Sequence, residues 1–149
     1  MAESDELTRT QYGAVPLRVA GDGRAQILLV TSRGTGRWIV PKGWPMQGLS
    51  PAEAAARESF EEAGVVGTIL GTGAVGAYRY RKRLTRGRVA LCEVSLFLLR
   101  VEQLLEDWPE RPQRTRQWFA PEAAAAAVDE DGLAAILRGV ETLLEAPIG

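Results

Sequence analysis

Short apolar runs separated by glycine-containing or polar turns make up most of the first 120 residues. Five of these runs have the length of β-strands rather than helices: 12–19, 25–31, 37–41, 89–101 and 115–119. The stretch 65–80 is broken by glycines, so it holds one or two further strands, and 81–87 follows as a basic hairpin loop. Pro16 lies inside the first run. Because proline cannot donate to a strand ladder, we expect that strand at a sheet edge or with a bulge.

A helix in the middle of the chain is marked chemically at both ends. Ser50 is a good N-cap, Pro51 suits the first helical position, and Glu53 completes a capping box. Gly64 follows the last turn as a C-cap, which gives a helix of about 13 residues. Within this helix Glu53 lies four residues before Arg57 and is therefore placed to pair with it.

Helical spacing returns near the end of the chain. Pro121 opens an alanine-rich helical turn, and Asp129 or Asp131 is expected to cap a final helix that runs to about Ala146. Its apolar residues recur at helical spacing and predict a face buried in the core: Leu133, Ile136, Leu137, Val140, Leu143 and Leu144.

Composition narrows the chemistry that the chain can carry. With 149 residues, 46% of them hydrophobic, we expect one domain (1–149) with a real core, in which 1–9 form a mobile tail. No histidine is present, which excludes a histidine base, a histidine metal ligand, and Ser-His or Cys-His catalysis. The one cysteine, Cys92, excludes an internal disulfide and a cysteine-based zinc site.

The order of elements and the charge balance bound the fold class and the partners. Strands with one helix in the middle and another at the end indicate an α/β (α+β) fold, with a mixed sheet between helices. The net charge of −1 gives no bias toward nucleic acid. No apolar stretch approaches the length of a membrane span, and the acidic start is unlike a signal peptide. We therefore expect a cytoplasmic monomer or homodimer that binds neither nucleic acid nor membranes.

Three glutamates of the central helix form the candidate reactive site. Glu58, Glu61 and Glu62 lie at i, i+3 and i+4, on one face, where each pair repels by roughly a few tenths of a kcal/mol. A divalent cation would turn this repulsion into attraction. Hard oxygen ligands suit Mg²⁺, which takes its remaining ligands from water and substrate phosphates, so the stripe indicates chemistry on a phosphoanhydride. The alternative is a solvated helix face without function.

The residues around these glutamates resemble the signature box of the Nudix hydrolases. Seven of its nine defined positions are in register: Gly43, Arg57, Glu58, Glu61, Glu62, Gly64 and Val65. Leu49 stands where the box has its first Glu, and Ser59 stands where it has an aliphatic residue. Four further segments resemble the diphosphoinositol and diadenosine polyphosphate branch: 28–33, 37–41, 105–108 and 114–119. That branch tends to carry Lys or Arg on the first strand, where this chain has Thr10, Gln11 and Tyr12.

The resemblance implies a Nudix-type α/β/α sandwich and a role for each box residue. Glu58 and Glu62 are expected to be the main metal carboxylates, with Glu61 as a further ligand or as the base that orients water. The Gly43 carbonyl is expected to face the metal as well. Arg57 is expected to orient the glutamates rather than to touch the substrate. The expected cofactor is Mg²⁺, with Mn²⁺ as the alternative.

Cations outside the box are expected to bind the substrate phosphates. Six cations fall within 79–88, and by strand alternation Arg79, Arg81 and Arg83 share one face. They form either a solvated loop or a site in which Arg81 and Arg83 capture phosphate. The resemblance adds four candidates: Arg33, Arg37, Lys42 and Arg116. A base from beyond the box could be any of three glutamates: Glu93, Glu102 and Glu106.

Together these features predict a Mg²⁺-dependent pyrophosphohydrolase that cleaves a nucleoside diphosphate linked to another group. Dinucleoside polyphosphates or diphosphoinositol-type polyphosphates are the preferred substrates. One alternative is a nucleoside triphosphate pyrophosphatase that cleans the nucleotide pool. The other is a non-catalytic Nudix-fold module that binds nucleotide or a protein partner. Leu49 and Ser59 favour that module, whereas the intact glutamate stripe favours the enzyme, because a binding module has no need of mutually repelling carboxylates.

Overall fold

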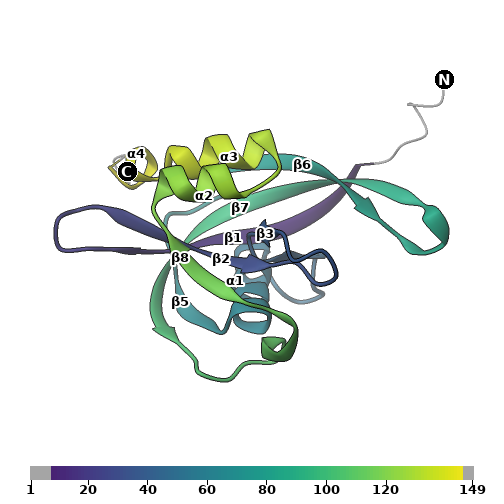
Figure 1. Cartoon of the computed structure of the whole chain (residues 1–149), viewed down its shortest axis with the longest axis horizontal. Helices are drawn as coiled ribbons and strands as arrows, with labels where there is room; N and C mark the ends of the chain where they lie inside the picture. The colour runs from purple at the N-terminus through teal and green to yellow at the C-terminus, as the bar shows by residue number, and fades with distance from the viewer. Residues whose placement is uncertain (1–7, 146–149) are drawn as a thin grey trace.

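A mixed sheet of eight strands forms the centre of the computed structural model, which describes residues 8–145 (Figure 1). The strands are β1 (Thr8–Val19), β2 (Ala25–Thr31), β3 (Trp38–Ile39), β4 (Lys42–Gly43), β5 (Val65–Ile69), β6 (Gly76–Arg83), β7 (Val89–Leu104) and β8 (Arg116–Phe119). The main path runs β3-β2-β1-β7-β5, with β4 paired to β1, β6 to β7 and β8 to β2. Strands β1 and β7 run parallel and the other recorded pairs are antiparallel.

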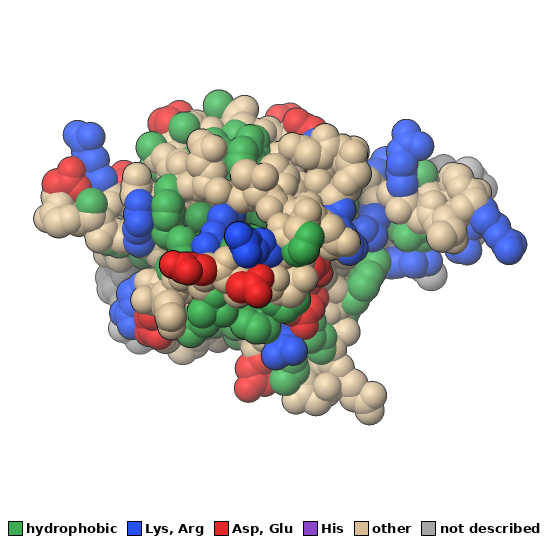
Figure 2. All heavy atoms as spheres, turned by 60° about the horizontal axis from the view of Figure 1, so that its bottom comes forward, with side chains coloured by type: hydrophobic (Ala, Val, Ile, Leu, Met, Phe, Trp, Pro, Cys, Tyr) green, Lys and Arg blue, Asp and Glu red, His purple; other side chains and the backbone are tan. Residues whose placement is uncertain are grey.

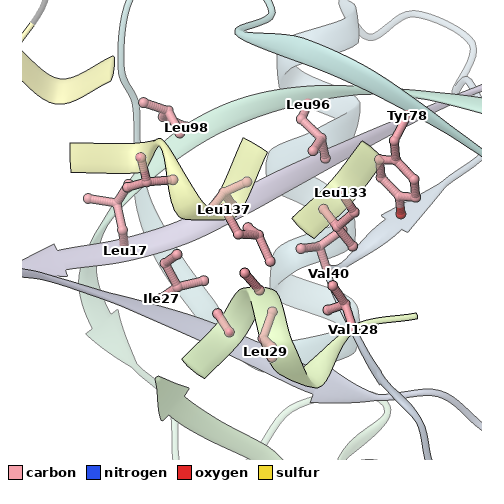
Figure 3. Close-up of a cluster of buried hydrophobic side chains, with 14 of the residues drawn as sticks. Leu17, Ile27, Leu29, Val40, Tyr78, Leu96, Leu98, Val128, Leu133 and Leu137 are labelled. Atoms are coloured by element: carbon pink, nitrogen blue, oxygen red, sulfur yellow. The ribbon is translucent and has the colours of Figure 1, made fainter. Parts of the chain in front are cut away.

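Helices cover both faces of this sheet, which confirms the predicted sandwich (Figure 1). The helical segments are α1 (Pro51–Ala63), η2 (Thr85–Gly87), η3 (Arg111–Gln113), α2 (Pro121–Ala127), α3 (Asp131–Arg138) and α4 (Val140–Glu145), of which η2 and η3 are short 3₁₀ turns. On one face, Leu133 and Leu137 of α3 pack on Leu17, Ile27 and other sheet residues (Figure 3). On the other face, α1 packs through its alanines. The face of the terminal helices is core, as their periodicity predicted.

Helix α1 has the bounds that its capping chemistry predicted. It spans 13 residues, the Ser50 Oγ accepts from the Glu53 N–H at 3.1 Å, and Gly64 ends it in the left-handed conformation (φ 68°). Ser59 faces the core with no exposed surface, and its hydroxyl donates to the Ala55 carbonyl at 3.2 Å. The helix therefore satisfies the polar group that stands at an aliphatic position of the Nudix box.

Strand β1 lies in the middle of the sheet and keeps an unbroken register with β7 across Pro16, so neither the edge position nor the bulge predicted there is found. Along one side β1 pairs first with β4, at Tyr12 and Gly13, and then with β2 from Leu17 onward. The Ala14 N–H points to this side, where it donates to the Pro41 carbonyl at 3.1 Å. Backbone N–H groups alternate along a strand, so the Pro16 nitrogen faces the gap between the two partner strands and no ladder bond is lost.

The predicted hairpin loop at 81–87 is largely strand. Strand β6 continues to Arg83 and pairs with β7 through Arg83↔Val89, so only the tip around η2 is a turn. Together β6 and β7 form an arm that projects from the body at the right of Figure 1. The alternation of cations and tyrosines was correct: Tyr78 is buried and Tyr80 half-buried, while Arg79 and Arg81 are exposed.

Two predictions near the chain ends also need correction. The final helix is broken at Gly139 into α3 and α4, and its N-cap is Glu130 rather than Asp129 or Asp131. The predicted tail at 1–9 lies mostly outside the described residues, but Thr8 and Arg9 already belong to β1. Within the described part of the chain, no helix is long and apolar enough to cross a membrane.

Candidate active site

A largely charged cleft of ≈ 890 Å³ gathers the glutamates of α1 and cations from distant parts of the chain. Besides α1, it is lined by the start of β1, the loop after β2, β4, the outer part of β6, the segment before β8 and the turn before α3. Figure 2 shows acidic and basic side chains close together on one face, and further basic side chains on the projecting arm. The sheet therefore brings opposite charges into one hollow.

All three predicted glutamates line this cleft. Glu62 is only 7% exposed; its carboxylate accepts from the Lys42 backbone N–H at 3.4 Å and lies 3.5 Å from the Arg114 guanidinium. Glu58 lies against Gly43, where a Cβ would overlap its carboxylate. Glu61 lines the cleft beside them, with 32% of its side chain exposed. The glycine of the Nudix box thus makes room for a glutamate side chain.

Burial and repulsion change the protonation of this cluster. Burial, and then the nearby charge of Glu62, raises the pKa of Glu58 to about 8. Burial also raises the pKa of Glu62, although Arg114 and Lys42 oppose the shift. Burial lowers the pKa of the Lys42 ammonium to about 8, against the neighbouring charges of Glu62 and Glu130. Negative charge on Glu58 and Glu62 is therefore poorly compensated by the protein, and a bound cation would stabilise it.

The oxygen ligands that these residues offer are of the type that a hard divalent cation prefers. Glu58, Glu61 and Glu62 offer only carboxylate oxygens, and Gly43 leaves the Glu58 carboxylate its space beside the backbone. Within residues 8–145, no three acidic side chains are arranged to hold an ion as they stand. Glu61 is instead held by Arg57, whose Nε donates to its Oε2 at 2.8 Å. A cation at this site would be held by the three glutamates, with the Gly43 carbonyl that the resemblance implies.

Arg57 contacts a glutamate of the stripe, but it does not pair with Glu53. The Glu53 Oε1 accepts from the Ser50 N–H at 2.8 Å, so the capping box occupies that carboxylate. Leu49 lies beside Arg57 in a second, shallow and mainly apolar pocket, and it is 40% exposed. Arg57 therefore has Glu61 as its carboxylate partner, and no carboxylate stands at position 49 to compete.

The segment before β8 adds two charged residues that the sequence analysis did not assign to the site. The Glu110 Oε1 accepts from Arg114 Nε and Nη2 at 2.9 and 2.7 Å. Arg114 is 5% exposed, and it also donates to the Thr31 carbonyl and lies near Glu62. The i, i+4 spacing of Glu110 and Arg114 is the sequence feature that could have predicted their ion pair. Their position beside α1 depends on the pairing of β8 with β2, which no local pattern shows.

Five of the six cations predicted to bind substrate line the cleft: Arg33, Arg37, Lys42, Arg81 and Arg83. Lys82, which was not predicted, lines it as well. Arg37 is already engaged, because its Nη1 donates to Asp129 at 3.1 Å and to Glu130 at 3.2 Å. The candidates for phosphate binding are Arg33, Lys42, Arg81, Lys82 and Arg83, whereas Arg114, which also lines the cleft, pairs with Glu110.

The sixth predicted cation, Arg116, does not line the cleft. Its guanidinium donates to the Ala63 and Leu105 carbonyls at 2.7 and 2.6 Å and lies 4.0 Å from the Trp108 ring centre. The Trp108 indole in turn donates to the Glu62 carbonyl at 3.0 Å. Arg116 thus lies apart from the other predicted cations, and its contacts hold the C-terminal end of α1.

None of the three glutamates considered as a base from beyond the box lines the cleft. Glu93 pairs with Arg79 at 3.2 Å. Glu102 accepts from the Thr68 hydroxyl, which lowers the pKa of its exposed carboxyl. Glu106 is exposed elsewhere. Glu110 is the glutamate from that part of the chain that reaches the cleft.

Comparison with known proteins gives matches to one family. The family model of the NUDIX domain matches residues 9–139. "Nudix hydrolase 16, mitochondrial" of Arabidopsis thaliana is 31% identical over 132 residues, which are 80% of this chain and 72% of that protein. Diphosphoinositol polyphosphate phosphohydrolase 2 of Rattus norvegicus is 39% identical over 102 residues, which are 66% of this chain and 52% of that protein. The matched part thus spans about half the length of the rat protein.

Solved structures with the same architecture support the fold. A binary complex of an Ap4A hydrolase from C. elegans superposes with a TM-score of 0.67 at 23% identity, covering 92% of this chain and 98% of that one. RenU, a Nudix hydrolase from M. smegmatis, superposes with a TM-score of 0.61 at 17% identity, covering 94% and 89%. At these identities, the likeness concerns the arrangement of sheet and helices.

Proposed function

Because this chain belongs to the Nudix hydrolase family, we propose that it is a divalent-cation-dependent pyrophosphohydrolase, with Mg²⁺ as the ion. Its substrate is a nucleoside diphosphate linked to another group, most readily a dinucleoside polyphosphate or a diphosphoinositol-type polyphosphate. The observation that carries the proposal is the poorly compensated glutamate cluster beside cations in one cleft. Hydrolysis of a phosphoanhydride needs both kinds of group. Cations neutralise the phosphates of the substrate, and carboxylates bind the metal ion.

Each charged group has a task in this proposal. A divalent cation held by Glu58, Glu61 and Glu62 would neutralise phosphate oxygens and lower the pKa of a water molecule. Lys42, with its Nζ 4.9 Å from the Tyr80 ring centre, and Lys82 bind phosphates further along the cleft. These groups hold the phosphate chain in one orientation, which lowers the barrier for attack by water.

The proton of the attacking water goes to a carboxylate of the cleft. The candidates are Glu110 and, where it does not bind the cation, Glu61; both line the cleft beside α1 and keep exposed surface. Arg57 holds Glu61, and Arg114 holds Glu110 in a fixed position, so each is oriented by an arginine. Either carboxylate can act as the base that orients water.

A non-catalytic nucleotide-binding module is the second candidate, because Leu49 leaves Glu61 as the carboxylate partner of Arg57. A third, a nucleoside triphosphate pyrophosphatase, differs only in substrate. Product release from a panel of phosphoanhydrides, with Mg²⁺ and with EDTA, separates them. The panel holds dinucleoside tetra- and pentaphosphates, diphosphoinositol polyphosphate, ADP-ribose and the common triphosphates.

We expect turnover that requires Mg²⁺ and is lost in Glu61→Gln/Glu62→Gln. The preferred compound then identifies the branch. A folded wild-type protein that binds nucleotide but releases no product from any compound would establish the binding module. Turnover that persists in EDTA, or in the double variant, would contradict the assignment of the glutamates.

A further inference from the structure

Two carboxylates at the start of α3 occupy one part of the cleft where a phosphate-binding cation was expected. Arg37, from the loop after β2, donates through a single nitrogen to Asp129 at 3.1 Å and to Glu130 at 3.2 Å. All three side chains line the cleft. We refer to Arg37, Asp129 and Glu130 as the acidic triad, because together they carry one positive and two negative charges.

The carboxylates of the triad are not fully paired with groups of the protein. The Glu130 Oε1 is buried, and among the described residues it is the buried side-chain oxygen or nitrogen atom without a hydrogen-bond partner. Asp129 keeps 66% of its side chain exposed at the edge of the cleft, so its carboxylate can accept further hydrogen bonds. Asp129 therefore offers hydrogen-bond acceptors to a ligand in the cleft, and the triad as a whole adds a net charge of −1 beside it.

The triad lies within electrostatic range of the phosphate-binding part of the cleft. Lys42 lines the same cleft as the triad, its backbone N–H donates to Glu62 at 3.4 Å, and the charge of Glu130 acts on its ammonium. A phosphate chain held by Lys42 would bring the group attached to it near Asp129 and Glu130. The chemistry of that group then decides whether the two carboxylates help or hinder binding.

We propose that the acidic triad selects substrates whose attached group is a nucleoside over those in which it is a densely phosphorylated inositol ring. The inference rests on the proposed function and narrows its substrate class. Ribose hydroxyls and the exocyclic amines of bases can donate hydrogen bonds to these carboxylates. Phosphate groups on a ring bring negative charge and acceptors, and they are repelled by the same carboxylates. The hydroxyls of Ser32 and Thr35, which also line the cleft, add neutral polar contacts beside Arg37.

The test compares the binding of two ligands that differ in this feature, a dinucleoside tetraphosphate and inositol hexakisphosphate. Calorimetry in EDTA measures both dissociation constants without turnover. The variants are Asp129→Asn, at an exposed position, and Glu130→Gln, both of which keep the shape of the side chain. Removing a charged acceptor should shift the ratio of the two dissociation constants by about tenfold toward the inositol ligand. Glu122→Gln, outside the cleft at an exposed glutamate that pairs with Arg138, is the matched control and should leave the ratio unchanged.

Three outcomes would overturn the proposal: an unchanged ratio in both variants, a shift toward the nucleotide, or a wild-type protein that binds neither ligand. An equal loss for both ligands is a case of the first outcome and indicates a structural role. The result is independent of catalysis. A shifted ratio in a protein without turnover refutes only the enzymatic function, whereas turnover with an unchanged ratio refutes only the role of the triad.

Discussion

At the scale of single residues, Leu49 determines which partner Arg57 has. The apolar side chain cannot accept a hydrogen bond, and Arg57 pairs with Glu61 at 2.8 Å instead. We infer that this ion pair competes with the binding of a cation by Glu61 together with Glu58 and Glu62. We expect Leu49→Glu to offer Arg57 a second carboxylate, to release Glu61 and to lower the Mg²⁺ concentration that gives half-maximal activity by about two- to fivefold, as suits one partly exposed ion pair.

The measurement is a Mg²⁺ titration of initial rates in the wild type and the variant. Leu49→Gln has the same length without the charge and serves as the control. It should leave the half-activating concentration where it is. If Leu49→Glu and Leu49→Gln behave alike, the charge at position 49 has no part in tuning the site.

Glu58 makes the stability of the metal-free protein depend on pH. Its pKa is raised from 4.5 to about 8 in the folded state, so folding takes up a proton between these values. The stabilisation is present below pH 4.5 and is lost as pH rises toward 8. We expect the melting temperature in EDTA to fall across this window, and saturating Mg²⁺ to remove the fall. Glu58→Gln should flatten the EDTA profile; an equally steep profile in that variant would place the titration elsewhere.

At the scale of elements, the segment between β7 and β8 holds the C-terminal end of α1. Arg116 donates to the carbonyls of Ala63 and Leu105, and Trp108 donates to that of Glu62. Arg116→Met removes both arginine donors and leaves partly buried carbonyls unpaired, so it should lower the free energy of unfolding by about 3 kcal/mol. Urea denaturation measures this loss.

Arg111→Met is the control for this prediction, because Arg111 is exposed and has only a 3.8 Å ion pair with Asp107. It should cost about 0.5 kcal/mol or less. Below its melting temperature, Arg116→Met should keep the KM of the wild type. A KM raised in a fully folded Arg116→Met protein would restore the substrate-binding role that the sequence predicted.

The elements that the sequence predicted well are those whose ends are chemically marked. Ser50, Glu53 and Gly64 define α1 by local hydrogen bonds, and the glutamates follow because they lie on that one helix. Features that depend on partners remote in sequence were missed. Pro16 is tolerated in a central strand because two different strands flank it, and Glu110 reaches the cleft only once β8 pairs with β2. Periodicity shows which face of an element is buried, but not which element covers it.

At the scale of the whole molecule, positive charge is concentrated in one region although the net charge is only −1. Six cations lie within 79–88, on the arm of β6 and β7, and three of them line the cleft: Arg81, Lys82 and Arg83. Figure 2 shows basic side chains on the projecting arm, beyond the body of the molecule. Such an arrangement raises the local concentration of anionic substrates and so their association rate, without contact at the reacting phosphate.

Arg86→Ala/Arg88→Ala removes two exposed cations at the tip of the arm and should test this steering. At low ionic strength we expect kcat/KM to fall by about three- to tenfold with kcat unchanged, because only the encounter is slowed. The difference should disappear near about 0.5 M salt, where charges are screened over a few ångströms. Arg24→Ala, an exposed arginine in the β1–β2 turn, which does not line the cleft, is the matched control and should show no loss. A loss that persists at high salt would mean that Arg86 or Arg88 touches the substrate, and the arm would then be part of the binding site itself.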